Sequence, residues 1–484
     1  MHKMSTKKLK NYLILFSIIF IGGILRLYNI NFDDLWSDEM ISYWLSDPSR
    51  NFEETIKLIF ESNLMVTYEL GLRYFHFFFG YNFEISRYFS AILGVLSLVM
   101  FSILINTNSS FKSVLFGTLL LAINIYHIKY SVELRSYILT FLLCIILLHL
   151  IFSNSFERDK VSFLRGTSIF FISIMMLFSH SFSIVVIFSI NIYFLIKFFY
   201  KKKLLINQLS IIIAINTASV IFLFYYLQNI SHTPYWIENV NLSFFTNFYF
   251  SKFFGSRIVG LCYILILIYL ICVQIKVLKK LDINFFFQVL IFFSYFLPIS
   301  YSFIFNPILI DRYIFFVLIP ILYLISNLVF LINSNKVRYT LISILISITL
   351  LNHILTENTF KQFYTEIFTT KPDVKKVFNM INKQNIGYFT FFMNDKNDDN
   401  YDLNKNYNKI YKNYLIQYSN KFNTKNRFID YKEIDYNDIP KNIWMIYIKD
   451  ITIEKFNVPE KLKNYSIKNK YFYNRIELYL LERL

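Results

Sequence analysis

Charge and cysteine are both scarce in this sequence, and each shortage narrows the class of protein. Only 17% of the 484 residues are charged, whereas 55% are hydrophobic and 20% are aromatic. A soluble protein of this composition would have to cover much of its surface with apolar side chains. The three cysteines, Cys144, Cys262 and Cys272, lie inside apolar runs, with no metal-ligand spacing and no disulfide pairing to infer. We therefore expect a membrane protein whose cysteines are small core residues.

Two kinds of signal are also missing. No nucleic-acid-binding motif accompanies the net charge of +17. The basic residues instead cluster in short loops between apolar runs, which is the pattern that sets membrane orientation. No small-residue cleavage site follows the first apolar stretch, residues 11–25, although lysines precede it. We expect no nucleic-acid partner and a retained first span.

Long apolar runs repeat along the chain from residue 11 to residue 353. Each is about as long as the ~20 residues that a helix needs to cross hydrocarbon. We expect about 11 transmembrane helices, near residues 11–25, 85–105, 113–129, 137–152, 163–178, 182–198, 208–227, 258–275, 285–305, 312–332 and 339–351.

The first outer loop, residues 26–84, contains two further helical segments. Residues 52–60 are amphipathic, and residues 64–79 are apolar but interrupted by Glu69, Arg73 and His76. A crossing at 64–79 would move every later basic loop to the outside, against the positive-inside bias. We expect residues 64–79 to lie in the outer membrane interface.

The basic loops then predict a multi-pass protein of the cell (plasma or inner) membrane. Its N-terminus is expected in the cytoplasm and its C-terminal domain outside. The loops expected in the cytoplasm carry Lys112, Arg158, Lys160, Arg165, Lys197, Lys201 to Lys203, Lys276, Lys279, Lys280, Lys336 and Arg338.

The remainder of the chain, residues 354–484, is polar and has only short apolar runs. Asp373 can cap a helix over residues 374–383, and residues 387–392, 444–448 and 476–481 are typical of strands. The Asn-rich stretch 395–409 is expected to be a loop. The fold class we predict is an α-helical polytopic membrane module, residues 1–353, followed by a small extracytoplasmic α/β domain. No internal repeat suggests a transporter built from duplicated halves.

Several ionisable and aromatic residues are expected together on the outer side. Such charges are expensive at membrane depth, which makes them candidates for function. Simpler explanations exist: the arginines could snorkel or pair with carboxylates, and His180 could be a hydrogen-bonded turn residue. The candidates are Asp38, Glu39, Glu69, Arg87, Tyr130, Glu133, Arg135, Tyr137, His180, Arg312 and Tyr313.

The segments around these residues resemble the motifs of one enzyme group. This group is the polytopic, GT-C type glycosyltransferases that use polyprenyl-phosphate sugars, and it includes protein O-mannosyltransferases and the lipid A aminoarabinose transferase. The resemblance covers nearly the whole chain, although the proline-containing run often found before the interfacial helix is absent from residues 63–69. The motifs are Leu35-Trp36-Ser37-Asp38-Glu39, residues 84–94, residues 126–137, residues 179–182 and Asp311-Arg312-Tyr313.

The resemblance implies an inverting transfer of a sugar from a polyprenyl-phosphate donor to a hydroxyl acceptor, in a protein, a lipid or a glycan. Asp38 would be the general base, and Glu39 would orient Asp38 or the acceptor. Arg135, with Arg312, would bind the lipid phosphate. Paired carboxylates could also hold a divalent metal ion, although no further ligand set is visible. A transporter or flippase for a lipid-linked glycan, and a scaffold or receptor, are the alternatives.

The predicted topology can be tested by cysteine labelling from the outer side of intact cells. Cysteines at positions 38, 133 and 400 should react, and a cysteine at position 202 should not, because the basic loops favour the cytoplasm. Labelling at position 202 but not at position 400 would overturn the arrangement.

Overall fold

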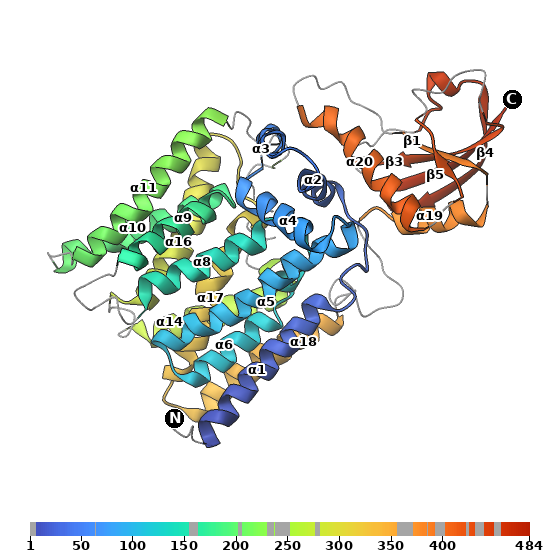
Figure 1. The fold of residues 1–484 in the computed structure, drawn as a ribbon. Helices are drawn as coiled ribbons and strands as arrows, with labels where there is room; N and C mark the ends of the chain where they lie inside the picture. The colour runs from blue at the N-terminus through green and yellow to red at the C-terminus, as the bar shows by residue number, and fades with distance from the viewer. Residues whose placement is uncertain are drawn as a thin grey trace. The chain divides into compact units, whose positions relative to one another are not determined.

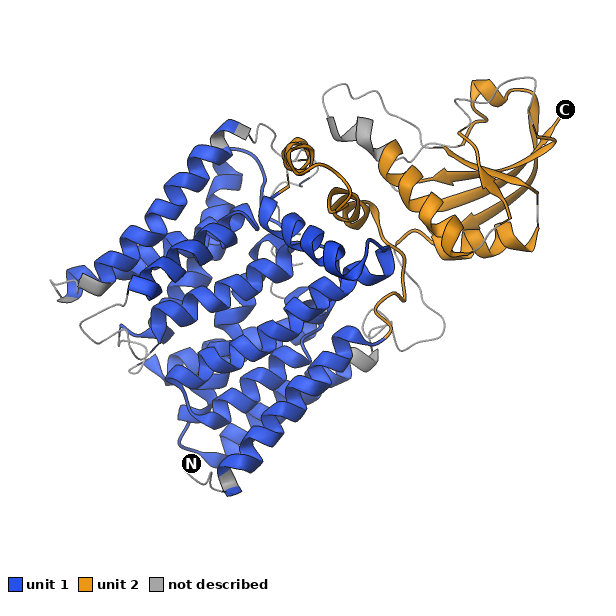
Figure 2. Ribbon diagram, viewed as in Figure 1, with its two compact units in different colours: residues 1–28, 65–361 blue, residues 29–64, 362–484 orange. Residues whose placement is uncertain are grey.

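The computed structural model describes most of the chain, as two compact units (Figure 2). Unit 1 comprises residues 1–28 and 65–361, and unit 2 comprises residues 29–64 and 362–484. Residues 29–64, which we expected in the membrane module, thus belong to the same unit as the C-terminal residues. The described residues are 6–62, 64–153, 163–201, 206–229, 237, 252–275, 281–355, 371–384, 386–392, 402–422, 425–430, 440–449 and 456–484. The loop residues Arg158, Lys160, Lys202, Lys203, Lys276, Lys279 and Lys280 lie outside them.

Unit 1 is helical, and each of the 11 apolar segments expected from the sequence coincides with helix (Figure 1). Within the bundle, α5 packs against α1, α6 and α8, α9 packs against α8 and α11, and α10 packs against α16. The elements are α1 (Thr6–Leu27), α4 (Val66–Phe79), α5 (Phe83–Asn108), α6 (Phe111–Ala122), α7 (Ile125–Ser131), α8 (Tyr137–Phe152), α9 (Phe163–Leu177), η2 (Ser181–Ser183), α10 (Ile184–Lys201), α11 (Ile206–Asn229), α14 (Arg257–Val273), α16 (Ile283–Ile304), η3 (Asp311–Val317), α17 (Leu318–Leu328), η4 (Val329–Leu331) and α18 (Asn335–Leu355).

Six helical stretches among the described residues are long and apolar enough to cross a membrane. They correspond to α1, α5, η2 with α10, α11, α16, and η3 with α17 and η4. The pair α6 and α7 would make a seventh, although the two helices are bent by 62° at the break between them. The helices α8, α9 and α14 are apolar but shorter. The chain is thus a polytopic membrane protein by length and composition, and the count of 11 crossings stays a prediction.

The break between α6 and α7 differs from the single span expected over residues 113–129. At a break, carbonyl groups at the end of α6 lose their helical partners, and inside a membrane no water replaces them. The fully buried guanidinium of Arg26 donates to the carbonyl oxygens of Ala122 (3.0 Å) and Leu121 (3.1 Å). Arg26 therefore caps α6 from the neighbouring helix α1.

The same guanidinium also fixes His127 on α7. Nη2 of Arg26 donates to Nδ1 of His127 over 2.7 Å, and Nε2 of His127 lies 2.8 Å from Oγ of Ser97 on α5. Since Arg26 has only donors, Nδ1 must accept, so the proton of the neutral ring sits on Nε2 and is donated to Ser97. The helices α5 and α7 pack closely at this point, because a Cβ added to Gly94 on α5 would lie 2.3 Å from Oγ of Ser131 on α7.

Residues 66–79 form the helix α4, as expected, and it is not among the candidate spans. Its 14 residues are fewer than the ~20 that a crossing needs. The helix packs on α5, where Oη of Tyr68 lies 2.7 Å from Oγ of Ser90. Its C-terminal aromatic residues Phe77, Phe78 and Phe79 are exposed, as in a helix that lies on a lipid interface. That location remains a prediction.

Unit 2 combines two short helices of the first loop with a small α/β domain. Five strands form one sheet in the order β2-β1-β3-β5-β4, in which β1 runs parallel to β2 and β3, and β5 runs antiparallel to β3 and β4. The elements are α2 (Ser37–Leu45), α3 (Phe52–Glu61), α19 (Val374–Lys383), β1 (Tyr388–Phe392), α20 (Asp402–Lys421), β2 (Arg427–Phe428), β3 (Asn442–Ile448), η6 (Glu460–Leu462), β4 (Tyr465–Tyr473) and β5 (Ile476–Arg483).

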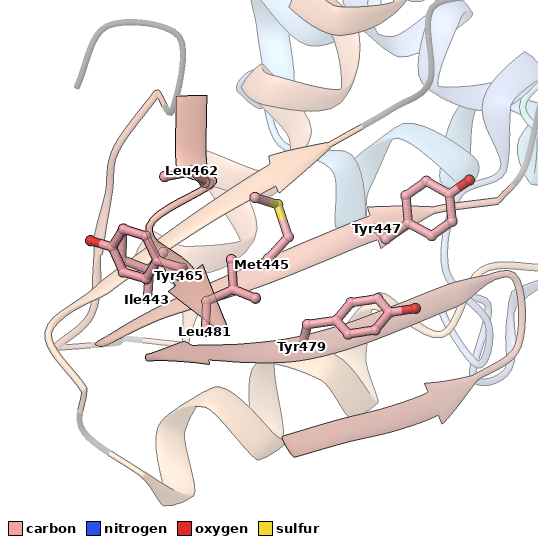
Figure 3. Packing of buried hydrophobic residues seen from close by; sticks show 7 residues of the cluster. All are labelled: Ile443, Met445, Tyr447, Leu462, Tyr465, Tyr479 and Leu481. Atoms are coloured by element: carbon pink, nitrogen blue, oxygen red, sulfur yellow. The ribbon is translucent and has the colours of Figure 1, made fainter. Parts of the chain in front are cut away.

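Side chains alternate along each strand, so the sheet has two faces, and β3 and β5 are buried on both. One face carries a buried cluster (Figure 3) of Ile443, Met445, Tyr447, Leu462, Tyr465, Tyr479 and Leu481. On the other face, the ring of Phe378 from α19 lies 5.4 Å from that of Phe389 on β1. Trp444 points to the same side, since its Nε1 donates to the carbonyl oxygen of Gln384.

The sequence predictions for this domain are partly confirmed. The helix over residues 374–383 and the three expected strands are present. The loop expected over 395–409 is wrong in its described part, because α20 begins at Asp402. The long strand β4 was not predicted.

Replacing Arg26 by Met should destabilise unit 1. The change removes the guanidinium donors to the carbonyl oxygens of Ala122 and Leu121 and to Nδ1 of His127. A buried acceptor left unpaired costs about 1–3 kcal/mol. The measurement is the thermal midpoint of the purified protein. Lys10→Met, an exposed change on the same helix, is the control and should leave the midpoint unchanged. An unaltered midpoint in Arg26→Met would contradict the capping role.

Candidate functional site

The acidic segment, residues 33–39, leads into the first turn of α2 in unit 2. Trp36 is the N-cap residue, so Asp38 and Glu39 are the second and third residues of the helix. Carboxylates interact favourably with the N-terminus of a helix, where backbone N–H groups have no partner in the helix. Asp38 is half-buried, whereas Glu39 is fully buried. The two neighbouring acids therefore have different environments.

Lys371 engages the carboxylate of Glu39. Its Nζ lies 2.8 Å from Oε2 of Glu39 and 3.5 Å from Oδ2 of Asp33. The same Oε2 accepts the backbone N–H of Trp36 over 3.4 Å. A buried carboxylate requires such compensation, because an unpaired charge is strongly destabilising. The geometry gives Glu39 a role in fixing the start of α2.

Asp34 supplies a cap to a distant helix. Its Oδ2 accepts the backbone N–H of Lys375 over 2.8 Å, in the first turn of α19. The helix's own N-cap residue, Asp373, makes no such bond. Oδ1 of Asp34 accepts the hydroxyl of Tyr418 on α20. Burial, followed by the nearby Tyr414 and Asp34, raises the pKa of Tyr418 well above its ordinary value, so the phenol keeps its proton and donates.

Four of the nine remaining candidates gather in unit 1 as an aromatic cluster of Tyr130, Tyr137, His180 and Tyr313. The ring centroids are 5.2 Å apart for Tyr130 and Tyr137, 5.5 Å for Tyr137 and His180, and 4.9 Å for His180 and Tyr313. These residues come from α7, α8, the segment before η2, and η3. The structure thus brings together residues that are far apart in the sequence.

Two arginines accompany this aromatic cluster. Cζ of Arg312 lies 5.9 Å from the ring centroids of both Tyr137 and Tyr313. Burial, together with the positive charges of Arg135 and Arg312, lowers the pKa of His180 to about 3. The imidazole is therefore neutral at physiological pH. Guanidinium groups beside aromatic rings can bind a planar or tetrahedral anion with directed hydrogen bonds.

Tyr126 and Asp311 adjoin the aromatic cluster, although neither is among the candidate residues predicted from the sequence. The hydroxyl of Tyr126 donates to Oδ2 of Asp311 over 2.7 Å, and its ring lies 4.7 Å from that of Tyr130. Nζ of Lys252 lies 3.7 Å from Oδ1 of Asp311. Tyr126 and Asp311 lie within the motifs that resemble those of the enzyme group, so this resemblance points to them as site residues. Their contacts tie α7 to η3.

Glu69, Arg87 and Glu133 are the other predicted residues of unit 1, and all three are buried. Glu69 lies on α4 and Arg87 on α5, which also meet where Nε2 of His76 lies 2.8 Å from Oγ of Ser86. The start of α4 is bonded to the segment before His180, since the N–H of Thr67 donates to the carbonyl oxygen of Phe178 over 3.0 Å. The carbonyl oxygen of Glu133 accepts the N–H of Arg135 over 2.9 Å.

A divalent metal ion at the acidic pair does not fit this geometry. Oε2 of Glu39 already accepts hydrogen bonds from the ammonium group of Lys371 and the backbone N–H of Trp36. Within the described ranges, no group of three or more His, Cys, Asp or Glu side chains could hold a metal ion.

No family model and no curated protein matches this chain. Among solved structures it is similar to the archaeal oligosaccharyltransferase AglB from Archaeoglobus fulgidus, in complex with an inhibitory peptide and a dolichol-phosphate. The TM-score is 0.50 and the identity 10%, over 91% of this chain and 70% of that chain. At this identity the likeness establishes the fold alone. The apolar helices and this likeness together define a polytopic membrane protein that shares the fold of AglB.

Proposed function

We propose that this protein is a membrane glycosyltransferase, which moves a sugar from a polyprenyl-phosphate donor to a hydroxyl acceptor on the extracytoplasmic face. The observation that carries the proposal is the placement of Arg135 and Arg312 beside the aromatic cluster of unit 1. The shared fold supports it, because AglB was solved with a dolichol-phosphate. A phosphate group on a lipid and a sugar ring suit guanidinium groups and aromatic faces, respectively.

In the proposed reaction, the acceptor oxygen attacks the anomeric carbon. A bond forms between that carbon and the acceptor oxygen, while the bond from the carbon to the phosphate oxygen breaks and the polyprenyl phosphate leaves. Negative charge grows on the phosphate as the bond breaks. Guanidinium groups placed at this oxygen stabilise the transition state more than the ground state, which is what accelerates the step.

The acceptor hydroxyl must lose its proton as it attacks, and we assign this proton to the carboxylate of Asp38. The assignment rests on the resemblance of residues 35–39 to the first-loop acidic motif of the family. The half-buried position of Asp38 is consistent with access to a substrate, in contrast to fully buried Glu39. General-base help of this kind contributes about 10²–10⁴-fold.

The acceptor is left open among a protein, a lipid and a glycan. Mass analysis of the cell-surface glycans of cells with and without the gene product identifies the transferred sugar and what carries it. A flippase would leave the bond between sugar and lipid phosphate intact, and a scaffold would neither break this bond nor move the donor.

Arg135→Lys should raise the apparent donor KM of the purified enzyme, because Lys keeps the charge but loses the bidentate fork. Arg165→Lys is the matched control: that guanidinium bonds the carbonyl oxygen of Leu150, at the opposite end of α8 from Tyr137. If the donor KM of Arg135→Lys equals that of the wild type, the phosphate site lies elsewhere, and Arg312→Lys is the next variant to measure.

Asp38→Asn should lower sugar transfer by at least about 10²-fold, the lower end of the general-base range. The amide is nearly isosteric, so the protein should still fold and insert. Asp47→Asn, just beyond the other end of α2, is the matched control. Near-normal transfer by Asp38→Asn would reject Asp38 as the base. A wild type that transfers no sugar at all would reject the glycosyltransferase itself.

A further inference from the structure

The acidic segment is held by residues that come more than 330 positions later in the chain. Lys371 bonds Glu39 at a separation of 332 residues, and the N–H of Lys375 bonds Asp34 at a separation of 341. We propose that Lys371 is a positioning residue, which sets the place of Asp38 by holding the two acids on either side of it. This inference rests on the proposed function, in which Asp38 is the base.

Lys371 is itself anchored to the sheet domain. Its carbonyl oxygen accepts Nδ2 of Asn474 over 2.8 Å, and the N–H of Asp373 donates to the carbonyl oxygen of Asn474 over 3.2 Å. Asn474 lies in the tight turn between β4 and β5, where Arg475 has a φ of 54°. The backbone that carries this ammonium group is therefore hydrogen-bonded to the turn between β4 and β5.

On the other side, the ammonium lies between two carboxylates. It is 2.8 Å from Glu39, one residue after Asp38, and 3.5 Å from Asp33, five residues before it. The Glu39 carboxylate also closes the first turn by accepting the N–H of Trp36. Asp38 thus sits between two fixed points, and its backbone has little freedom to move.

Stability alone explains this ion pair poorly. The helix α2 already buries the apolar residues Met40, Ile41, Tyr43, Trp44 and Leu45. A buried ion pair adds little net stability over apolar packing, since desolvation offsets most of the attraction. Apolar packing does not fix the orientation of the first turn of α2, where Asp38 lies. The ion pair does fix this orientation.

The test compares Lys371→Met, Lys371→Arg and the matched control Lys376→Met in the purified full-length protein. Lys376 pairs with Asp373 at 3.1 Å and has an exposed side chain. Lys371→Met should lower kcat by about 10²-fold, the effect of displacing a catalytic group by ~1 Å. The donor KM should be unchanged, because the phosphate is bound by other residues. Hydrogen exchange of the amides of Leu35 and Met40 should become faster.

Lys371→Arg should restore much of the kcat and the amide protection, because it keeps a cation at the position, and Lys376→Met should match the wild type. The proposal is overturned if Lys371→Met keeps the wild-type kcat, or if kcat falls while exchange of residues 35–40 stays unchanged. If the wild type transfers no sugar, the proposed function fails separately, and Lys371 then has no base to position.

Discussion

The guanidinium of Arg26 makes the interaction on which unit 1 depends. A helix that breaks inside a membrane exposes backbone carbonyl groups to a medium without water, and each must find a donor within the protein. Arg26 satisfies the end of α6 and at the same time orients the ring of His127 on α7. Because α7 also carries Tyr126 and Tyr130, the break that Arg26 stabilises brings these rings into contact with Asp311 and the aromatic cluster.

In unit 2, the contacts that matter most are those that order a loop rich in carboxylates. Asp33, Asp34 and Glu39 each meet a donor from the C-terminal part of the chain, namely an ammonium, a helix N-terminus or a phenol. Capping interactions and buried ion pairs are directional, so they fix the orientation of this segment. A helix cap also stabilises by about 0.5–2 kcal/mol. The C-terminal domain therefore also holds the acidic segment in place.

The sequence predicts the helices of unit 1 well, because a run of ~20 apolar residues has few other solutions in a membrane. It does not reveal the break after Ala122, since a straight and a bent pair of helices have the same hydropathy. The Asn-rich composition hides the start of α20, although Ile410, Tyr411 and Tyr414 further along this helix recur at helical spacing and are buried. The roles of Arg26 and Lys371 depend on partners about 100 and 332 positions away, which no local pattern encodes.

The separation between Glu39 and Lys371 also sets an order of events during synthesis. At roughly 5–20 residues per second, the ribosome reaches Lys371 on the order of 17–66 s after Glu39. During that interval the early loop has none of its later donors and stays hydrated, which suits a segment with several carboxylates. The ion pair of Glu39 and the cap from Asp34 can form only after Lys371 and Lys375 have been made. A nascent chain that has not yet reached Lys371 thus carries these carboxylates without their later donors.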